Sequence, residues 1–305
     1  MSLRRFAIIT TGCTFILLLL GGLVHNTRSS LACPDWPLCF GQVFPKMQGG
    51  VLVEHSHRLA AATVAILAFV LMVASIVRAL KRRDSGVAIA GGIAFALVMA
   101  QAVLGGITVI YRLPTIVSTA HLATSQLFFV TLIYVAFRAG DTGRALPKKV
   151  QRMTLWGAGL VYAQMILGAL MRHLGAGLAC TTVPLCEGKI WPTGVHPNVT
   201  LHVMHRLFAL VVFGHLVGMA IVVVRNVDRP LVKALAIAAP VLAVVQITLG
   251  ILSITTFLDA VPVTAHLGVA AAILADCTIL YLVARGPLHA RASETAPVVG
   301  AEVAA

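Results

Sequence analysis

Eight apolar stretches, each long enough to cross a lipid bilayer, constrain this chain more than any other feature. A membrane-spanning helix needs about 20 mostly apolar residues, and 59% of the 305 residues are hydrophobic. No remaining stretch is long or polar enough for a separate soluble domain, so we expect an all-α membrane protein. The expected spans are 6–24, 51–77, 87–110, 115–137, 152–172, 199–224, 231–254 and 262–284.

The positive charges indicate how these spans are oriented. The net charge is +13, and 16 of the 23 Lys and Arg residues lie before the first span, after the last, or in every second connection and the span edges that border it. With eight spans, all of these lie on one side of the membrane, and positive charge favours the cytoplasmic side. We therefore predict both termini inside, a multi-pass protein of the cell membrane with the lipid bilayer as its surroundings, and no nucleic-acid partner.

The chain repeats itself. The segment Leu31–Cys39 returns as Leu178–Cys186 after 147 residues, and Thr119–Leu122 returns as Thr264–Leu267 after 145 residues. Each half holds four spans, so both halves have the same orientation, and a pseudo-two-fold axis along the membrane normal is expected. We predict two four-helix bundles, 1–138 and 152–285, joined by a cytoplasmic linker at 139–151 and followed by a disordered cytoplasmic tail at 286–305.

Four histidines recur at one depth near the outer ends of the even-numbered spans. They are His57, His121, His205 and His266, roughly 8–10 Å below the outer surface at the helical rise per residue. Four imidazoles at one depth suit two six-coordinate haems. The alternative is that each histidine makes a hydrogen bond between helices.

A glycine near the end of each preceding span stands at a repeated distance from its histidine. The separations are 36, 16, 37 and 16 residues, counted from Gly21, Gly105, Gly168 and Gly250. These glycines are expected to give a flat macrocycle clearance at the level of the backbone.

The two halves differ beside their first histidine. Glu54 stands three residues before His57 and shares its helix face, whereas His202 takes the matching place before His205. Only the first half thus combines a ligand candidate with a buried carboxylate, which can transfer a proton or stabilise charge. Arg58 and Arg206 directly follow ligand candidates and are candidate partners of haem propionates; the alternative is that they extend to the lipid headgroups.

Two cysteine pairs lie in the long outer loops. Cys33 and Cys39 are separated by five residues, as are Cys180 and Cys186. Because both loops are expected to face the oxidising side, we predict two disulfides within these pairs. Free thiols, or one metal site shared by all four sulfurs, are the alternatives.

These motifs, taken together over about residues 1–285, resemble the haem A synthase family. The resemblance implies that haem O, the substrate, binds between His57 and His121, and that a permanent haem b binds between His205 and His266. It further implies that a ring methyl group of haem O is oxidised to a formyl group, giving haem A for terminal oxidases, and that Glu54 is the essential carboxylate. A haem O synthase and an electron acceptor are candidate partners.

The residues alone support less than the resemblance. They indicate a membrane protein with two haems and one acid-bearing site. An electron-transfer cytochrome with two haems b, without chemistry on the haem, explains the histidines but not Glu54. A transporter with parallel repeats predicts ion-binding residues near the midplane, whereas the polar residues here gather near the outer surface.

Overall fold

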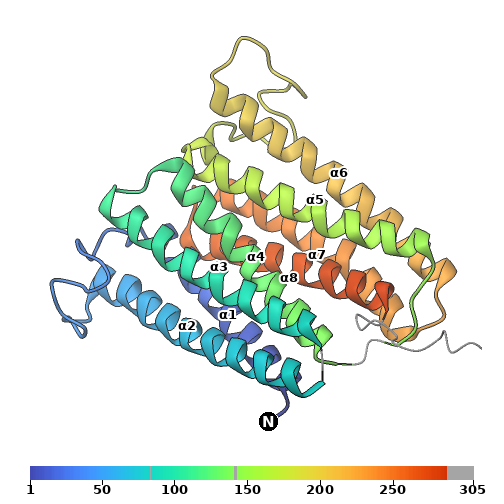
Figure 1. Cartoon of the computed structure of the whole chain (residues 1–305). Helices are drawn as coiled ribbons and strands as arrows, with labels where there is room; N and C mark the ends of the chain where they lie inside the picture. Colours follow the sequence, from blue (N-terminus) through green and yellow to red (C-terminus); the bar gives the residue numbers. More distant parts are fainter. Residues whose placement is uncertain (83, 141–142, 287–305) are drawn as a thin grey trace, which may run out of the picture.

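The computed structural model describes residues 1–82, 84–140 and 143–286, and within them the fold is entirely helical (Figure 1). The predicted eight long helices are confirmed, and each is long and apolar enough to cross a membrane. A single turn of 3₁₀ helix, η1, precedes α6. The elements are α1 (Leu3–Asn26), α2 (Gly49–Arg82), α3 (Ser85–Ile110), α4 (Thr115–Arg138), α5 (Lys148–His173), η1 (Ala176–Leu178), α6 (Pro197–Asn226), α7 (Pro230–Thr255) and α8 (Ala260–Arg285).

Short polar or proline residues set several of the helix starts. The side chains of Ser2 and Asp259 accept hydrogen bonds from the first-turn backbone N–H groups of α1 and α8. Pro197 and Pro230 occupy the first turns of α6 and α7, where a missing N–H costs nothing. The helices therefore begin close to where the apolar stretches begin.

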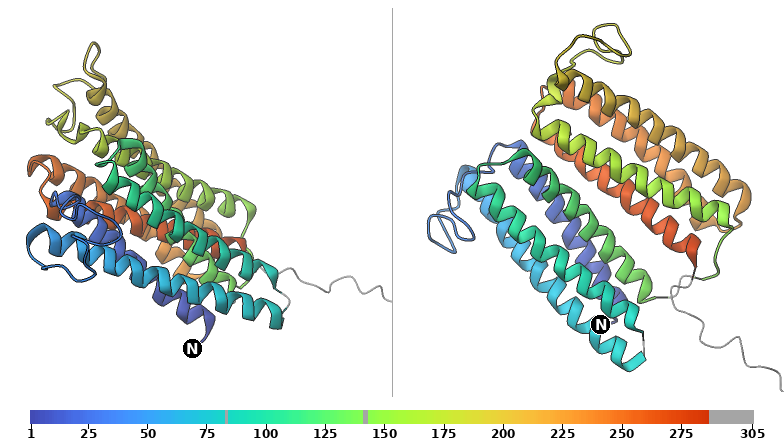
Figure 2. Two further views of the ribbon diagram at one scale, coloured as in Figure 1. Left: turned by 60° about the vertical axis from the view of Figure 1, so that its left-hand side comes forward. Right: turned by 45° about the horizontal axis from the view of Figure 1, so that its top comes forward.

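The helices form two groups of four that meet along one interface. Helices α1–α4 contact one another in a closed ring, as do α5–α8, and the groups touch through α1, α4, α5 and α8. Figure 2 shows these groups side by side. Each has its own apolar core, around Leu71 and Leu132 in the first and around Leu216, Met219 and Leu280 in the second.

Large apolar side chains also cover the outside of the helices. Ile66, Ile89, Leu210 and Val241 are each more than half exposed. A bilayer would remove such a surface from water, so the distribution fits a multi-pass membrane protein. The orientation of the helices in a membrane stays a prediction.

The long connections lie at one end of the molecule, which we call the loop end. Residues 27–48 and 174–196 form these connections, and the N-terminus lies at the opposite end of α1 (Figures 1 and 2). The linker contacts the second group, since the N–H of Leu146 donates to the carbonyl of Ala284. The domain boundaries stay a prediction, and the expected disorder of 286–305 falls almost wholly outside the described residues.

Candidate functional site

In the first helix group, both candidate histidines lie against the glycines that the spacing pairs with them. A methyl group on Gly21 of α1 would lie 3.0 Å from Cε1 of His57 on α2. One on Gly105 of α3 would lie 3.4 Å from Cε1 of His121 on α4. The imidazoles of His57 and His121 are also close enough to interact electrostatically.

The second helix group repeats this arrangement. A methyl group on Gly168 of α5 would lie 3.0 Å from Cε1 of His205, and one on Gly250 of α7 would lie 3.2 Å from Cε1 of His266. His205 and His266 again interact electrostatically. The glycines therefore make room for the imidazole rings, and the clearance that they are expected to give a flat macrocycle stays a prediction.

The other ring nitrogens show how these histidines could bind a metal. Nδ1 of His266 lies 3.0 Å from the carbonyl oxygen of Gln246, and Nδ1 of His205 lies 3.2 Å from the side-chain nitrogen of Gln164. A metal-bound histidine usually donates its second N–H to such an oxygen, which fixes the ring. His266 thus has Nε2 available for iron, and its geometry fits an axial ligand.

Among the described residues, Nδ1 of His57 is buried without a hydrogen-bond partner, whereas His121 interacts with the backbone of Gln101. Such orphaned polar atoms are unusual in a finished core. Paired imidazoles on facing helices, seated against glycines, fit an iron porphyrin better than a packing role in either group. The assignment of all four histidines as ligands stays a prediction.

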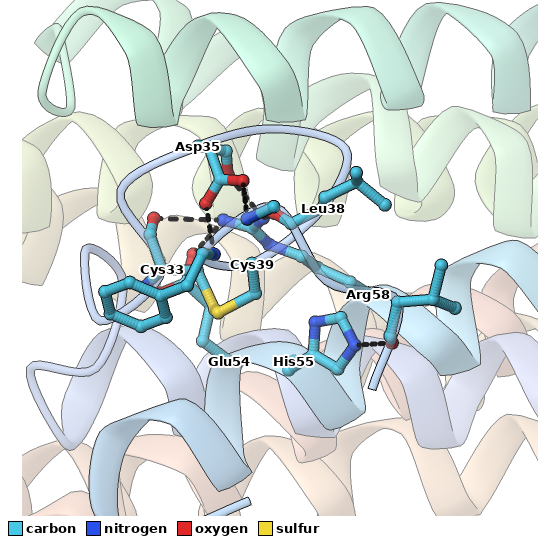
Figure 3. Close-up of a disulfide and its surroundings, with 10 residues drawn as sticks. Cys33, Asp35, Leu38, Cys39, Glu54, His55 and Arg58 are labelled. Atoms are coloured by element: carbon cyan, nitrogen blue, oxygen red, sulfur yellow. Dashed lines mark hydrogen bonds and ion pairs between the residues drawn. A yellow bond between two sulfur atoms is a disulfide. The ribbon is translucent and has the colours of Figure 1, made fainter. Parts of the chain in front are cut away.

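Glu54 is buried and tied to the first long loop (Figure 3). Its Oε2 accepts a hydrogen bond of 2.8 Å from the backbone N–H of Cys33, and its Oε1 forms an ion pair of 2.5 Å with Arg58. The carboxylate therefore fastens residues 27–48 to the start of α2. Its catalytic role stays a prediction.

His202, at the matching place in the second group, also binds its loop, but with the opposite chemistry. The ring is buried, and Nδ1 lies 3.0 Å from the carbonyl oxygen of Ala176 in η1. Glu54 accepts from a loop N–H, whereas His202 donates to a loop carbonyl. In both groups a side chain at this position therefore holds the loop by a hydrogen bond, but only in the first group is that side chain an acid.

The two candidate propionate partners also contact the loops. Arg58 donates through Nη1 to the carbonyls of Asp35 and Leu38, at 2.6 and 2.5 Å, and through Nη2 to that of Cys33 at 3.3 Å. These bonds hold the loop over the beginning of α2. Propionate binding by Arg58 stays a prediction, but these donors already have partners.

Arg206 does the same in the second group. It donates through Nη1 to the carbonyls of Thr182 and Pro184, at 2.7 and 3.4 Å, and through Nη2 to that of Cys180 at 2.6 Å. The arginine after each first histidine thus organises a disulfide loop. Propionate binding by Arg206 stays a prediction as well.

Both predicted cysteine pairs lie at disulfide distance, Cys33 with Cys39 and Cys180 with Cys186. Nitrogen of His55 lies within 4.8 Å of the first pair of sulfurs, a grouping that could hold a metal ion. Because those sulfurs bond to each other and Nε2 of His55 lies 2.7 Å from the carbonyl of Val43, we read the grouping as a disulfide.

Two further contacts shape the first loop. Asp35 accepts hydrogen bonds from the N–H groups of Phe40 and Gly41, at 2.6 and 2.8 Å. These bonds, that from Gly41 foremost, hold the pKa of the Asp35 carboxyl below its usual value. The ring of Trp36 packs on Gly106 of α3, next to the glycine that seats His121. The loop therefore covers the loop end of the first group.

Sequence reasoning missed a polar cluster between the two groups. The rings of His25 and His173 pack edge to face, with centroids 5.2 Å apart. Asn26 donates to Thr264 at 3.0 Å, and Arg172 donates to Asn26 at 3.2 Å. Thr119 lies 3.2 Å from Nδ1 of His173. We call these six residues the inter-half cluster; residues 25–26 and 172–173 are matched by the 147-residue offset, which is the signal that could have revealed it.

Comparison with known proteins shows which family the chain matches. The family model COX15-CtaA, described as cytochrome oxidase assembly protein, matches residues 4–51 and 47–278, a range that includes Glu54 and all four histidines. Similar proteins named Heme A synthase come from Bacillus pumilus (strain SAFR-032), 29% identical over 70% of this chain and 72% of the relative, and from Symbiobacterium thermophilum, 31% identical over 68% and 71%. One from Bacillus cereus (strain ATCC 14579) is 27% identical over 96% of both chains.

Proposed function

This chain belongs to the COX15-CtaA family of cytochrome oxidase assembly proteins, and from that premise we propose that it is a haem A synthase. It would oxidise a ring methyl group of haem O to the formyl group of haem A. The observation that carries the proposal is the set of paired imidazoles, each seated against a glycine of the preceding helix. The name Heme A synthase, which the similar proteins bear, supports the proposal.

In this proposal the two helix groups hold different haems. His57 and His121 bind the substrate haem O, and His205 and His266 bind a resident haem b. Haem b, when bound, supplies one-electron transfer. The carbonyl oxygen of Gln246 accepts a hydrogen bond from Nδ1 of His266 and would keep that ring oriented for this role.

The acid in the first group is the reason to place the chemistry there. Converting a methyl to a formyl group through hydroxylated intermediates adds an oxygen atom, passes electrons to an acceptor and moves protons, so a group that can hold or transfer a proton is needed near the substrate. Glu54 is buried, lies one helical turn before His57, and is held by Cys33 and Arg58. Its carboxylate would hold a proton or stabilise positive charge, whereas His202 in the second group is tied to a loop carbonyl.

The proposal extends to the surroundings of the protein. The basic residues favour a place in the cell membrane with the two disulfide loops on the outer side. We expect a haem O synthase to supply the substrate and an electron-accepting protein to reoxidise the resident haem.

Extraction of the pigments from purified protein tests the function. Haem b together with haem O or haem A supports a haem A synthase. Haem b alone in both sites would favour a two-haem electron-transfer cytochrome and contradict the proposal. His205→Ala and His266→Ala should each remove the low-spin haem b signal, whereas His215→Gln, in the same helix as His205, should keep it. Unchanged haem b in both alanine variants would refute the ligand assignment.

A further inference from the structure

The inter-half cluster places the guanidinium of Arg172 and the imidazoles of His25 and His173 at the loop end, between the two candidate haem sites. Arg172 and His173 end α5, and His25 lies in the last turn of α1. Thr119 lies 3.2 Å from Nδ1 of His173, and Thr264 accepts a hydrogen bond from Asn26. These threonines stand two residues before the candidate ligands His121 and His266. His173 is close enough to His121 to interact electrostatically. The cluster therefore lies beside His121 and His266, the second candidate ligand of each helix group.

The positive charge of Arg172 has no acidic partner there. Arg28 lies close enough to repel it, and the ion pairs recorded within residues 1–82, 84–140 and 143–286 involve Glu54, Asp84 and Asp228, none with Arg172. Its Nε is buried without a hydrogen-bond partner. The helix dipole at the end of α5 favours a cation, but it gives that N–H nothing to bind.

An unpaired guanidinium in an apolar setting is costly, and the usual remedy is an anion. A carboxylate suits it, because a guanidinium N–H donates a strong, charge-assisted hydrogen bond to a carboxylate oxygen. The two imidazoles of His25 and His173 add further donors beside it. By contrast, the guanidinium groups of Arg58 and Arg206 already donate hydrogen bonds to loop carbonyls.

We propose that the inter-half cluster is a carboxylate site that receives a propionate of a bound haem, with Arg172 as its main donor. The inference rests on the haem binding proposed above. The position beside both His121 and His266 allows the propionate to come from the haem of either helix group. The shared chemistry, a carboxylate on the porphyrin edge, is what the cluster recognises.

Haem binding to cofactor-depleted protein in detergent tests this site without measuring activity. Haem b is titrated alongside its dimethyl ester, in which both propionates are blocked. Wild-type protein should bind the free acid about tenfold more tightly or better, as expected for a hydrogen bond to a charged group. Arg172→Gln keeps an amide to bind Asn26, removes the charge, and should lose most of that preference.

Arg225→Gln serves as the matched control, because Arg225 is an exposed cation in the last turn of α6, far from the loop end. It should keep the wild-type preference. Repeating the titrations in His121→Ala and His266→Ala protein shows which haem provides the propionate. If the preference for the free acid persists only in His121→Ala, the propionate belongs to the haem of the second group. If it persists only in His266→Ala, the propionate belongs to the haem of the first group.

Equal binding of the acid and the ester by wild-type protein would overturn the proposal, and this arm needs no variant. An unchanged preference in Arg172→Gln would overturn it as well, while leaving haem binding itself intact. Wild-type protein that binds neither haem would instead refute the proposed function together with this site. If Arg172→Gln does not fold, His173→Asn, which introduces the residue found at the matched position 26, should show the reduced preference.

Discussion

The backbone N–H of Cys33 donates a hydrogen bond of 2.8 Å directly to Oε2 of Glu54. The residue that the sequence marks as a candidate acid is therefore also the anchor of a disulfide loop (Figure 3). Any variant of Glu54 tests both roles, so its readouts must separate loop order from turnover.

Glu54→Gln should retain haem b and bind haem O, yet produce little or no haem A. The amide keeps the size of the side chain and an oxygen for the N–H of Cys33, but it loses the charge and the ion pair with Arg58. Haems extracted from membranes and separated by chromatography give the yield. Glu187→Gln, an exposed acid in the other long loop, should behave as wild type. A normal haem A yield from Glu54→Gln would return the residue to a purely structural role.

Gly168→Ala should lower haem b content. Its methyl group would lie 3.0 Å from Cε1 of His205, closer than side chains normally approach, so the imidazole must move. Overpacking of this kind costs about 1–3 kcal/mol. Gly159→Ala in the same helix has nothing within 4 Å and should leave the haem spectrum unchanged. Equal spectra for both variants would contradict close packing of the His205 ring against Gly168.

Replacing Cys33 and Cys39 by serine should destabilise the first loop. The bridge joins residues six apart, and closing so short a loop contributes about 2 kcal/mol in the loop-entropy model. Mass spectrometry after alkylation of the oxidised wild-type protein should find these thiols, and those of Cys180 and Cys186, protected. Four freely alkylated loop cysteines would rule out both bridges.

The first loop should also loosen in acid. The folded pKa of Asp35 lies below its usual value, so its contribution is fully present above the unfolded pKa of about 4 and is lost as the pH falls through the lowered folded pKa. Hydrogen exchange at Phe40 and Gly41 should therefore speed up below pH 4 beyond its intrinsic change. In Asp35→Asn this extra dependence should vanish; if it persists, another group controls the loop.

The helices were predictable from the sequence, because apolar length fixes a membrane helix. The contact of each glycine with its matched histidine was not, since a repeated separation shows only that the two residues recur together. The partners of Arg58 and Arg206 were not, since an arginine beside a ligand candidate suits a propionate and a loop carbonyl equally well. The inter-half cluster was missed for a different reason. His25 and His173 follow the helix-end glycines within a few residues, but only packing of α1 against α8 and of α5 against α4 brings them together.

The contacts of Asn26 and His173 run crosswise between the groups. Asn26 of the first group binds Thr264 of the second, and His173 of the second binds Thr119 of the first, from positions matched along the chain. In a symmetric dimer, residue i of one subunit contacts residue j of the other, and the reverse contact also forms. The interface between the two halves of this single chain has the same isologous arrangement. Each half thus contributes a residue next to the second candidate ligand of the other half, His121 or His266. A half produced alone would therefore be expected to pair with a copy of itself before it could hold its haem.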